Sequence, residues 1–262
     1  MGILNVTPDS FSDGGKYLNR TAAVSHAIRM VEDGADIIDV GGESTRPGAT
    51  SADIDEEIER TIPVIAEIRP RIKVAISIDT MKSSVARAAI EAGADIVNDV
   101  SACTNDPEMA DVISETGSGV VLMHMQGTPG TMQNNPQYDD VVSDVAAYLH
   151  ARVEALVRRG IARESMVVDP GIGFGKTVEH NLRLLTHLDQ FGKDGLPVLV
   201  GLSRKSFLGK ITGRMVNERV TAGIAAMVFC IMNGVDIVRV HDVKETVDAI
   251  SVIGALKKAQ ED

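Results

Sequence analysis

Tryptophan is absent from this 262-residue sequence, and aromatic residues make up only 3% of it. Apolar residues still account for 44%, so the core must be aliphatic and built from Val, Ile, Leu, Ala and Met. A core of this composition is typical of a parallel sheet that is buried on both faces.

Positive charge is also scarce. The 26 Lys and Arg residues are outnumbered by 37 Asp and Glu residues, which gives a formal net charge of −11. This balance argues against nucleic acid or an anionic membrane as the main partner. An anionic ligand would therefore have to be held by a local cluster of basic residues.

Cysteines and membrane-targeting signals are equally sparse. Cys103 and Cys230 lie far apart and match no metal-binding or redox spacing, so we expect buried thiols in a reducing compartment. No stretch is long and apolar enough to span a bilayer. The start at Met1 lacks the charged region of a signal peptide, and Val6 stands where myristoylation needs Ser or Thr. These features predict a cytoplasmic enzyme.

Short β-branched runs alternate with longer amphipathic segments about every thirty residues, which is the spacing of βα units. The eight expected strands are Gly2–Val6, Ala35–Val40, Val74–Asp79, Asp95–Asn98, Gly119–His124, Met166–Asp169, Pro197–Leu202 and Asp236–Val240. The expected helices are Arg20–Asp33, Ile54–Ile68, Ser83–Ala92, Pro107–Thr116, Asp139–Arg159, Val178–Leu188, Val216–Asn233 and Val243–Ala259. Glycines that suit a left-handed helix end follow several of them, at Gly34, Gly93, Gly117, Gly160 and Gly234.

Eight strand–helix pairs either close into a barrel or form a wide doubly wound sheet. A doubly wound sheet would normally carry a glycine-rich dinucleotide fingerprint after its first strand, and Asn-Val-Thr-Pro after Gly2–Val6 is not one. We therefore predict an α/β fold, a single parallel (β/α)8 TIM barrel. No linker or low-complexity segment divides the chain, so residues 1–262 are expected to form one domain.

Every expected strand carries polar residues at its C-terminal end or just beyond it. These residues are Asn5, Glu43 to Arg46, Asp79, Asn98, His124, Asp169, Ser203 to Lys205, Arg239 and His241. Taken singly, an Asp or Asn at a strand end can also cap the next helix. In a barrel, however, all these positions converge on one rim, where barrel enzymes have their active sites. We therefore expect the active site at the C-terminal rim of the strands.

One short motif is misleading. Gly173-Phe174-Gly175-Lys176-Thr177 resembles the end of a phosphate-binding loop. The glycine required five residues before Gly175 is replaced by Pro170, so the pattern fails.

The remaining motifs form an ordered series that covers nearly the whole chain: MGILNVTPDSFSDGG, GGESTRPG, SIDT, NDVS, MHMQGTPGTMQ, DPGIGFGK, GLSRKSFLG and RVHDV. This series resembles the dihydropteroate synthases, a family of pterin-binding enzymes. The resemblance implies condensation of 6-hydroxymethyl-7,8-dihydropterin diphosphate with p-aminobenzoate to give 7,8-dihydropteroate and diphosphate in folate biosynthesis. It also implies that sulfonamides compete with p-aminobenzoate.

A pterin ring offers donors and acceptors along its edge, so a selective pocket needs fixed carboxylate, amide and ammonium groups. The resemblance places these residues on the pterin: Asp79, Asn98, Met123, Asp169, Phe174, Gly201 and Lys205. Met123 and Phe174 either flank the ring or fill the core. For Asp79 and Asp169 the alternative is helix capping or a buried ion pair with a barrel lysine.

A diphosphate leaving group requires cations and backbone donors. The rim residues assigned to it are Asn5, Arg46, Arg239 and His241. Arg46 and Arg204 have an alternative reading as solvated surface charges. Asn5 offers a neutral oxygen suited to Mg²⁺, which takes few protein ligands when a substrate phosphate is present. We therefore expect Mg²⁺ as the cofactor and Asn5 as its protein ligand.

No Ser or Cys stands beside a general base, so the protein lacks a nucleophile for covalent catalysis. Departure of diphosphate would leave a cation delocalised over the pterin, stabilised by Asp79, in a dissociative (SN1-like) reaction. The amine of p-aminobenzoate would then attack. By resemblance the p-aminobenzoate pocket consists of Phe11, Thr45, Pro47, Lys205 and Ser206, and the expected catalytic residues are Asp79, Lys205, Asp169 and Arg239.

Two other functions stay open. A methyltetrahydrofolate-dependent methyltransferase shares the barrel but needs no diphosphate clamp, so the basic rim residues favour the synthase. A non-catalytic pterin-binding barrel would have lost site residues, and none of those expected is missing. Finally, the segment Ala222–Met232 is apolar nearly all round, and the resemblance implies a homodimer.

Overall fold

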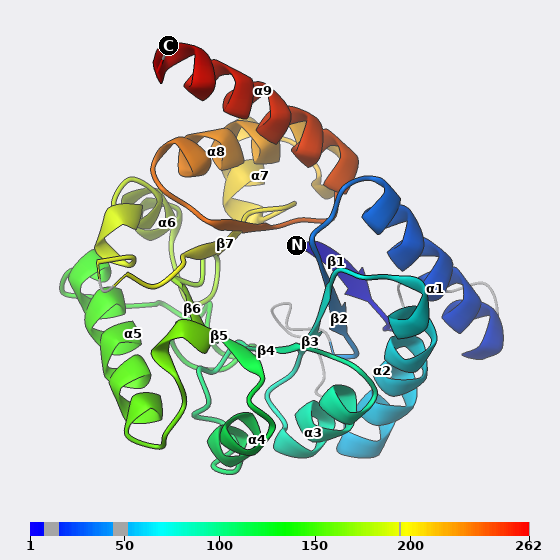
Figure 1. Cartoon of the computed structure of the whole chain (residues 1–262). Coiled ribbons are helices and arrows are strands. Elements are labelled where there is room, and N and C mark those ends of the chain that lie inside the picture. The colour runs from blue at the N-terminus through cyan, green and yellow to red at the C-terminus, as the bar shows by residue number, and fades with distance from the viewer. Residues whose placement is uncertain (8–15, 44–51, 194, 262) are drawn as a thin grey trace.

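Strands and helices alternate along the chain in the computed structural model, which describes residues 1–7, 16–43, 52–193 and 195–261 (Figure 1). The strands are β1 (Gly2–Asn5), β2 (Ile37–Gly41), β3 (Ala75–Asp79), β4 (Ile96–Asp99), β5 (Gly119–Met123), β6 (Met166–Asp169), β7 (Leu199–Gly201) and β8 (Ile237–Arg239). The helices are α1 (Lys16–Glu32), α2 (Ile54–Ile68), α3 (Ser83–Glu91), α4 (Met109–Thr116), α5 (Val141–Val157), α6 (Val178–Leu185), α7 (Ser206–Thr212), α8 (Val220–Met232) and α9 (Val243–Glu261).

The strands are parallel and follow one another in sequence order. β1 to β6 form one sheet and β7 pairs with β8 in a second. Single parallel bridges join the two sheets at both seams, Val168 with Val198 and Gly2 with Val240. At the second seam the Ile3 backbone N–H donates to the Val240 carbonyl over 2.9 Å. The strands therefore run round a ring with the helices outside it, as predicted for a (β/α)8 barrel (Figure 1).

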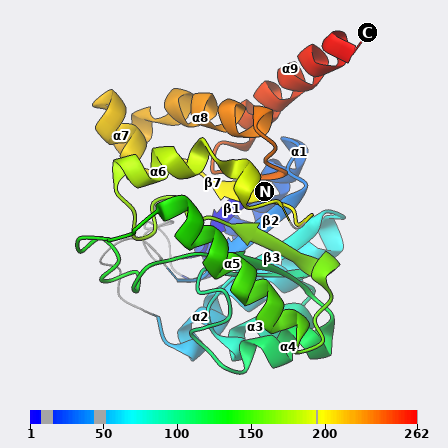
Figure 2. The same cartoon turned by 90° about the vertical axis from the view of Figure 1, so that its left-hand side faces the viewer.

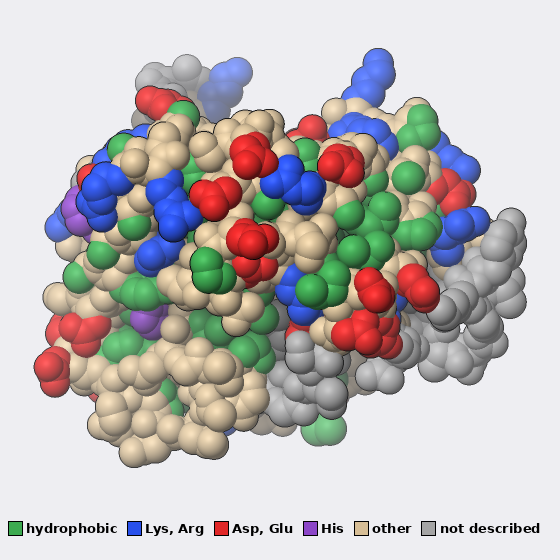
Figure 3. Space-filling view, turned by 90° about the horizontal axis from the view of Figure 1, so that it is seen from below, with side chains coloured by type: hydrophobic (Ala, Val, Ile, Leu, Met, Phe, Trp, Pro, Cys, Tyr) green, Lys and Arg blue, Asp and Glu red, His purple; other side chains and the backbone are tan. Residues whose placement is uncertain are grey.

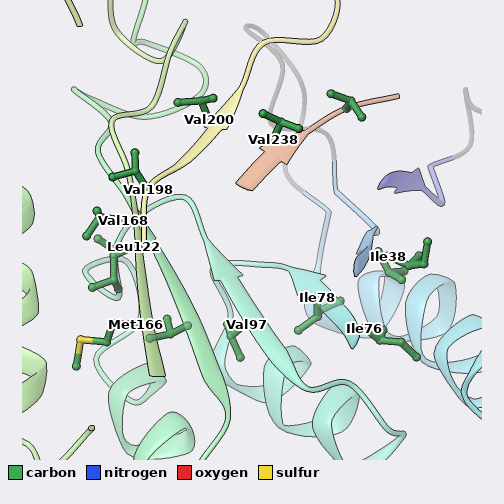
Figure 4. Close-up of a cluster of buried hydrophobic side chains, with 14 of the residues drawn as sticks. Ile38, Ile76, Ile78, Val97, Leu122, Met166, Val168, Val198, Val200 and Val238 are labelled. Atoms are coloured by element: carbon green, nitrogen blue, oxygen red, sulfur yellow. The ribbon is translucent and has the colours of Figure 1, made fainter. Parts of the chain in front are cut away.

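Aliphatic side chains cover both faces of the ring. On the outer face, buried residues of neighbouring strands pack together and against the helices (Figure 4), among them Ile38, Ile76, Ile78, Val97, Leu122, Met166, Val168, Val198, Val200 and Val238. A separate cluster lies inside the ring and contains Met1, Val121 and Leu199, with Ile37, Ile96, Val167 and Ile237 against it. Burial on both faces explains why the strands are apolar until close to their C-terminal ends.

The prediction was wrong for the segment between β7 and β8. A helix from Val216 to Asn233 was expected, but α8 begins at Val220, and a separate short helix, α7, covers Ser206–Thr212. Seven residues with a glycine at position 209 give too weak a periodic signal to identify a helix from sequence. The helix forms because Phe207 and Leu208 are buried.

The glycines expected to follow helices all have positive φ: Gly34, Gly93, Gly117, Gly160 and Gly234. Gly117, for example, has φ 66° and caps α4 through a hydrogen bond from its N–H to the Ile113 carbonyl. Among the described residues, no helix is both long and apolar enough to cross a membrane.

Candidate active site

The residues at the strand ends are aligned across the sheet by its register. Asn5, Gly41, Asp79 and Asn98 occupy one row of paired positions from β1 to β4. Met123 pairs with Asp169, and Gly201 pairs with Arg239. Figure 2 shows the connection from β5 to α5 extending beyond the helices at the end of the barrel where these strands finish. Among the described residues, the predicted strand-end residues Asn5, Asp79, Asn98, Asp169 and Arg239 therefore share one rim.

Arg239 lies at the centre of the charged groups of this rim. Its Nε donates to Asp39 Oδ2 and its Nη2 donates to Asp79 Oδ2, both over 2.6 Å. Burial alone would lower the pKa of Arg239, but the charges of Asp39 and Asp79 outweigh burial and raise it. Asp79 is thus in a buried ion pair, although its partner is an arginine of the last strand and not a lysine.

Asp79 combines burial with a strong neighbouring charge. Burial raises the pKa of its carboxyl to about 7, and the guanidinium of Arg239 opposes that shift. The nearby carboxylates of Asp39, Glu57 and Asp99 push the pKa of Asp79 further up. The group therefore titrates near neutrality and its charge is sensitive to anything that binds beside it.

Asp39 is a site residue that the sequence analysis missed. It is 0% exposed, and besides Arg239 it accepts a hydrogen bond from Nδ2 of Asn98 over 3.2 Å. Asp39 lies two residues before the end of β2, so the pattern of polar residues at strand ends does not include it. The feature of the sequence that could have identified Asp39 is a carboxylate inside the otherwise apolar run from Ile37 to Val40.

Asp169 and Lys205 form the opposite side of the rim. Asp169 is buried, and its Oδ1 accepts from the Gly171 N–H over 2.7 Å. Burial raises the pKa of Asp169, opposed by that hydrogen bond and by the charge of Lys205. Lys205 has a pKa lowered to about 8 by burial, and its Nζ lies 4.1 Å from the centre of the Phe174 ring. Phe174 therefore contacts a rim residue, and its place beside the pterin stays a prediction.

The loop after β6 can lie this close to the site because of its glycines. Gly171 has φ 68°, and a Cβ atom there would lie 1.9 Å from the His124 carbonyl oxygen. Gly175 has φ 64°, and a Cβ atom there would lie 2.7 Å from the Gln126 carbonyl oxygen. The motif DPGIGFGK is therefore explained by tight packing of this loop against the loop after β5.

Lys176, at the end of that motif, binds no carboxylate among the described residues. Its Nζ contacts Nδ1 of His124 at 3.0 Å and donates to the carbonyl of Phe174 over 2.9 Å. Burial lowers the pKa of Lys176 to about 7 and, together with that amine, lowers the pKa of His124 to about 3. The pair connects the loops after β5 and β6, which agrees with the rejection of a phosphate-loop role for Lys176.

Of the residues expected to hold diphosphate, Asn5, Arg239 and His241 lie in the described part of the chain. The ring Nδ1 of His241 lies 3.0 Å from Ser203 Oγ, and its backbone N–H donates to the same oxygen. Arg204, by contrast, pairs with Asp242 over 2.6 Å and is 41% exposed, which favours a surface role. Ser206 is exposed at the first turn of α7. The other predicted residues, Phe11, Thr45, Arg46 and Pro47, lie outside the described residues.

A divalent cation would fit this rim at Asn5. Within the described ranges, no group of three or more His, Cys, Asp or Glu side chains could hold a metal ion. Asn5 pairs with Gly41, and an added Cβ at Gly41 would contact both Asn5 Oδ1 and the Asp79 side chain. The amide oxygen thus lies beside a carboxylate, a donor set suited to Mg²⁺ when phosphate oxygens supply further ligands.

Known proteins resemble this chain over its full length. Residues 1–241 match the model of the family described as pterin binding enzyme. The dihydropteroate synthase of Escherichia coli K12 is 48% identical over 261 residues, covering 100% of this chain and 92% of that protein. Two solved structures superpose with a TM-score of 0.93 and cover 98% of this chain. The Yersinia pestis dihydropteroate synthase with a sulfonamide drug complex is 44% identical, with 94% of that chain covered. The Xanthomonas albilineans dihydropteroate synthase with 4-aminobenzoic acid is 46% identical, with 92% of that chain covered.

The fold, the ordered motifs and these matches agree with one another. The chain therefore belongs to the pterin-binding enzyme family as a member of the dihydropteroate synthases, which are transferases.

Proposed function

We propose that this chain joins 6-hydroxymethyl-7,8-dihydropterin diphosphate to p-aminobenzoate, releasing diphosphate and 7,8-dihydropteroate. The observation that carries the proposal is the cluster of Asp79, Asn98, Asp169, Lys205 and Arg239 on one rim. It supplies carboxylate, amide, ammonium and guanidinium groups at one end of the barrel, with Asp79, Asn98 and Asp169 buried and Lys205 and Arg239 partly exposed. A flat heterocycle with donors and acceptors on its edge needs this set.

The pterin would lie between the two sides of the rim. Asp169 and Asn98 present acceptors to its donor edge, and the Lys205 ammonium donates to its ring acceptors. Phe174 covers one face of the ring while holding Lys205 in place, and Met123 and Gly201 border it from neighbouring strand ends. Asn98 and Asp169 are buried, so their electrostatic effect on the ring is larger than it would be in solvent.

The reacting bond joins the pterin methylene carbon to a diphosphate oxygen. When it breaks, the electron pair leaves with the oxygen and positive charge spreads over the pterin ring. Ionised Asp79, fixed by Arg239, stabilises that charge without having to reorganise. The amine nitrogen of p-aminobenzoate then bonds to the carbon and loses a proton, which completes a dissociative reaction.

The leaving diphosphate would be held by His241, Asn5 and Arg239. In Arg239 the nitrogen meant is Nη1, because Nε and Nη2 donate to Asp39 and Asp79. The resemblance adds Arg46 to this group. Mg²⁺, ligated by Asn5 and the phosphate oxygens, would neutralise part of the charge on the diphosphate. Calorimetry should show weak Mg²⁺ binding to the protein alone and tighter binding with diphosphate. Equal Mg²⁺ affinity in the two titrations would contradict this assignment.

The p-aminobenzoate pocket is assigned by resemblance to Phe11, Thr45, Pro47, Lys205 and Ser206. Ser206 lies in the first turn of α7 and is exposed, so a ligand can reach it. The printed descriptions of the Xanthomonas and Yersinia structures name 4-aminobenzoic acid and a sulfonamide as ligands of those proteins. We propose that both bind this chain at the same pocket.

We also propose that the protein forms a homodimer through the outer face of α7 to α9. Large apolar side chains are exposed there, namely Ile211, Met215, Val216, Phe229, Met232, Ile250, Val252 and Leu256. The 13 residues of α8 include no charged one. The α3 and α4 side of the barrel differs, because acidic and basic side chains alternate over it (Figure 3). An apolar face of this kind on a barrel helix is typical of a subunit interface.

The dimer proposal has a matched test in sedimentation analysis. Phe229→Glu places a charge on α8 at a position 45% exposed in the single chain, and it should shift the protein towards monomer. Leu182→Glu on α6, at a position 44% exposed, should leave the oligomeric state unchanged. A monomeric wild-type protein would contradict the proposal outright.

We propose a reducing compartment such as the cytoplasm as the place of action. Both cysteines are buried and free. Burial raises the pKa of Cys103 and raises that of Cys230 to about 12, so neither is a reactive thiolate at neutral pH.

Mass spectrometry tests the proposed reaction directly. Protein mixed with pterin diphosphate, p-aminobenzoate and Mg²⁺ should yield dihydropteroate and diphosphate. Omitting p-aminobenzoate should abolish dihydropteroate. Pterin binding without any turnover would instead support a non-catalytic barrel.

A further inference from the structure

Asp39 connects two residues of the pterin site although it lies beneath the rim. Its Oδ2 accepts hydrogen bonds from Arg239 Nε at 2.6 Å and from Asn98 Nδ2 at 3.2 Å. The side chain is 0% exposed, so water does not compete for these contacts. Asp39 is therefore placed to act through its neighbours and not on a substrate directly.

The contact with Arg239 decides what Asp39 can offer Asn98. A guanidinium has only N–H donors, and Arg239 Nε donates to Asp39 Oδ2 over 2.6 Å. The oxygen that faces Asn98 is this same Oδ2, so it is already used as an acceptor. Only the nitrogen end of the Asn98 amide can therefore face Asp39.

The orientation of the Asn98 amide follows from this restriction. With Nδ2 turned towards Asp39, Oδ1 points away from it, and no side chain or backbone group of the described residues donates to Oδ1. Asn98 pairs in register with Asp79 at the rim, where the pterin is proposed to bind. An asparagine without such a neighbour could present either end of its amide.

We infer that Asp39 is a positioning and specificity-determining residue: it locks the Asn98 amide so that its oxygen faces the pterin pocket. This inference rests on the proposed function. The pocket then offers acceptors at both Asn98 and Asp169, which select a ring edge bearing an amino group. A ring with a carbonyl oxygen in place of that amino group would bring an acceptor against an acceptor, and the site rejects it.

Equilibrium binding of two ring compounds tests the inference. The probes are a 2-amino-4-oxo pterin and its 2,4-dioxo counterpart, and calorimetry gives the ratio of their dissociation constants. Wild-type protein should prefer the amino compound. In Asp39→Ala the Asn98 amide is free to turn over, so the preference should shrink by about tenfold. Asp39→Leu, which fills the space without supplying an acceptor, should behave in the same way and serves if the alanine variant does not fold.

Two controls separate orientation from charge and from general loosening. Asp39→Asn retains an oxygen for both donors and should keep the preference within about twofold. Asp99→Ala removes another fully buried carboxylate, which acts on Asp79 through its charge but, among the described residues, hydrogen-bonds to Ser101 and Cys103 and not to the Asn98 side chain. It should lower the melting temperature and leave the ligand preference unchanged.

Each failure has a distinct meaning. If wild-type protein binds neither compound, the proposed function fails. If it binds both equally, or if Asp39→Ala and Asp39→Leu keep the wild-type preference, the inference is overturned while pterin binding stands. The inference is also overturned if Asp99→Ala or Asp39→Asn reduces the preference as much as Asp39→Ala does.

Discussion

The interior of the barrel has two layers, which are formed by residues two positions apart on the same strands. On β2 Ile37 is followed two residues later by Asp39, on β4 Ile96 by Asn98, on β6 Val167 by Asp169, and on β8 Ile237 by Arg239. The lower residue of each pair packs in the apolar cluster with Met1, Val121 and Leu199, and the upper residue belongs to the charged rim. The apolar cluster, called the floor from here on, stabilises the ring. The charged rim provides the chemistry.

Among the rim residues, Asp79 is expected to have the largest effect on activity. Asp79→Asn removes the charge proposed to stabilise the pterin cation, so kcat should fall by about 10²–10³. Because burial already disfavours the ionised carboxylate, the melting temperature should stay unchanged or rise. Initial rates and a thermal melt check both expectations. Near-normal turnover by the folded variant would remove Asp79 from catalysis.

A second substitution pair compares two neighbouring cations on the rim. Lys205 contacts Phe174 within the site, whereas Arg204 forms an exposed ion pair with Asp242. Lys205→Ala should lower kcat/KM by about 10- to 100-fold, as expected for a lost hydrogen bond to a charged group. Arg204→Ala should lower it by no more than about fivefold, because exposed ion pairs contribute little. An equal loss in the two variants would show that both face the ligand.

The strands were predictable from sequence because their signal is local. β-Branched runs, glycines after helices and polar residues at strand ends can each be recognised within a few residues, and the rim residues Asp79, Asn98 and Asp169 were found in this way. α7 gave no such signal, since its seven residues are stabilised by burial of Phe207 and Leu208 and not by helix propensity.

The pairing of the rim charges could not be read from the sequence. Arg239 is 200 residues from Asp39 and 160 from Asp79, and only closure of the ring brings the three together. Curvature of the sheet likewise makes Asp39 on β2 a partner of Asn98, which lies two strands away on β4. The contacts of Lys176 likewise could not be predicted without the tertiary fold. Its partners are the His124 side chain in the loop after β5 and the Phe174 carbonyl in its own loop.

The pH dependence of kcat/KM should reflect two rim groups whose pKa values burial moves in opposite directions. Asp79, with a pKa raised to about 7, must be ionised, so activity should fall about tenfold per pH unit below that value. Lys205, with a pKa lowered to about 8 by burial and by Arg239, must be protonated, so activity should also fall above pH 8. The optimum should therefore lie between the two values.

Lys205→Arg serves as the control for the alkaline limb. A guanidinium keeps its charge above pH 8, so the alkaline fall should move to higher pH while the acid limb stays in place. An unchanged alkaline limb would assign it to another group, such as the substrate amine or Lys176.

The smallest effect on activity is expected for the floor, where the effect on stability is large. Leu199 is 0% exposed on β7, and its side chain packs with Met1 and Val121 inside the ring. Leu199→Ala leaves a cavity there, which should lower the free energy of unfolding by about 2–5 kcal/mol. Denaturant titration measures that loss, and Leu182→Ala at a 44% exposed position on α6 should cost only about 0.5 kcal/mol or less. At a temperature where circular dichroism shows both variants to be folded, kcat/KM should equal that of the wild type, because the rim is held by its own hydrogen bonds to Arg239 and Asp39. If kcat/KM of folded Leu199→Ala fell tenfold or more, packing of the floor would control the geometry of the rim, and the two layers would have to be treated as one mechanical unit.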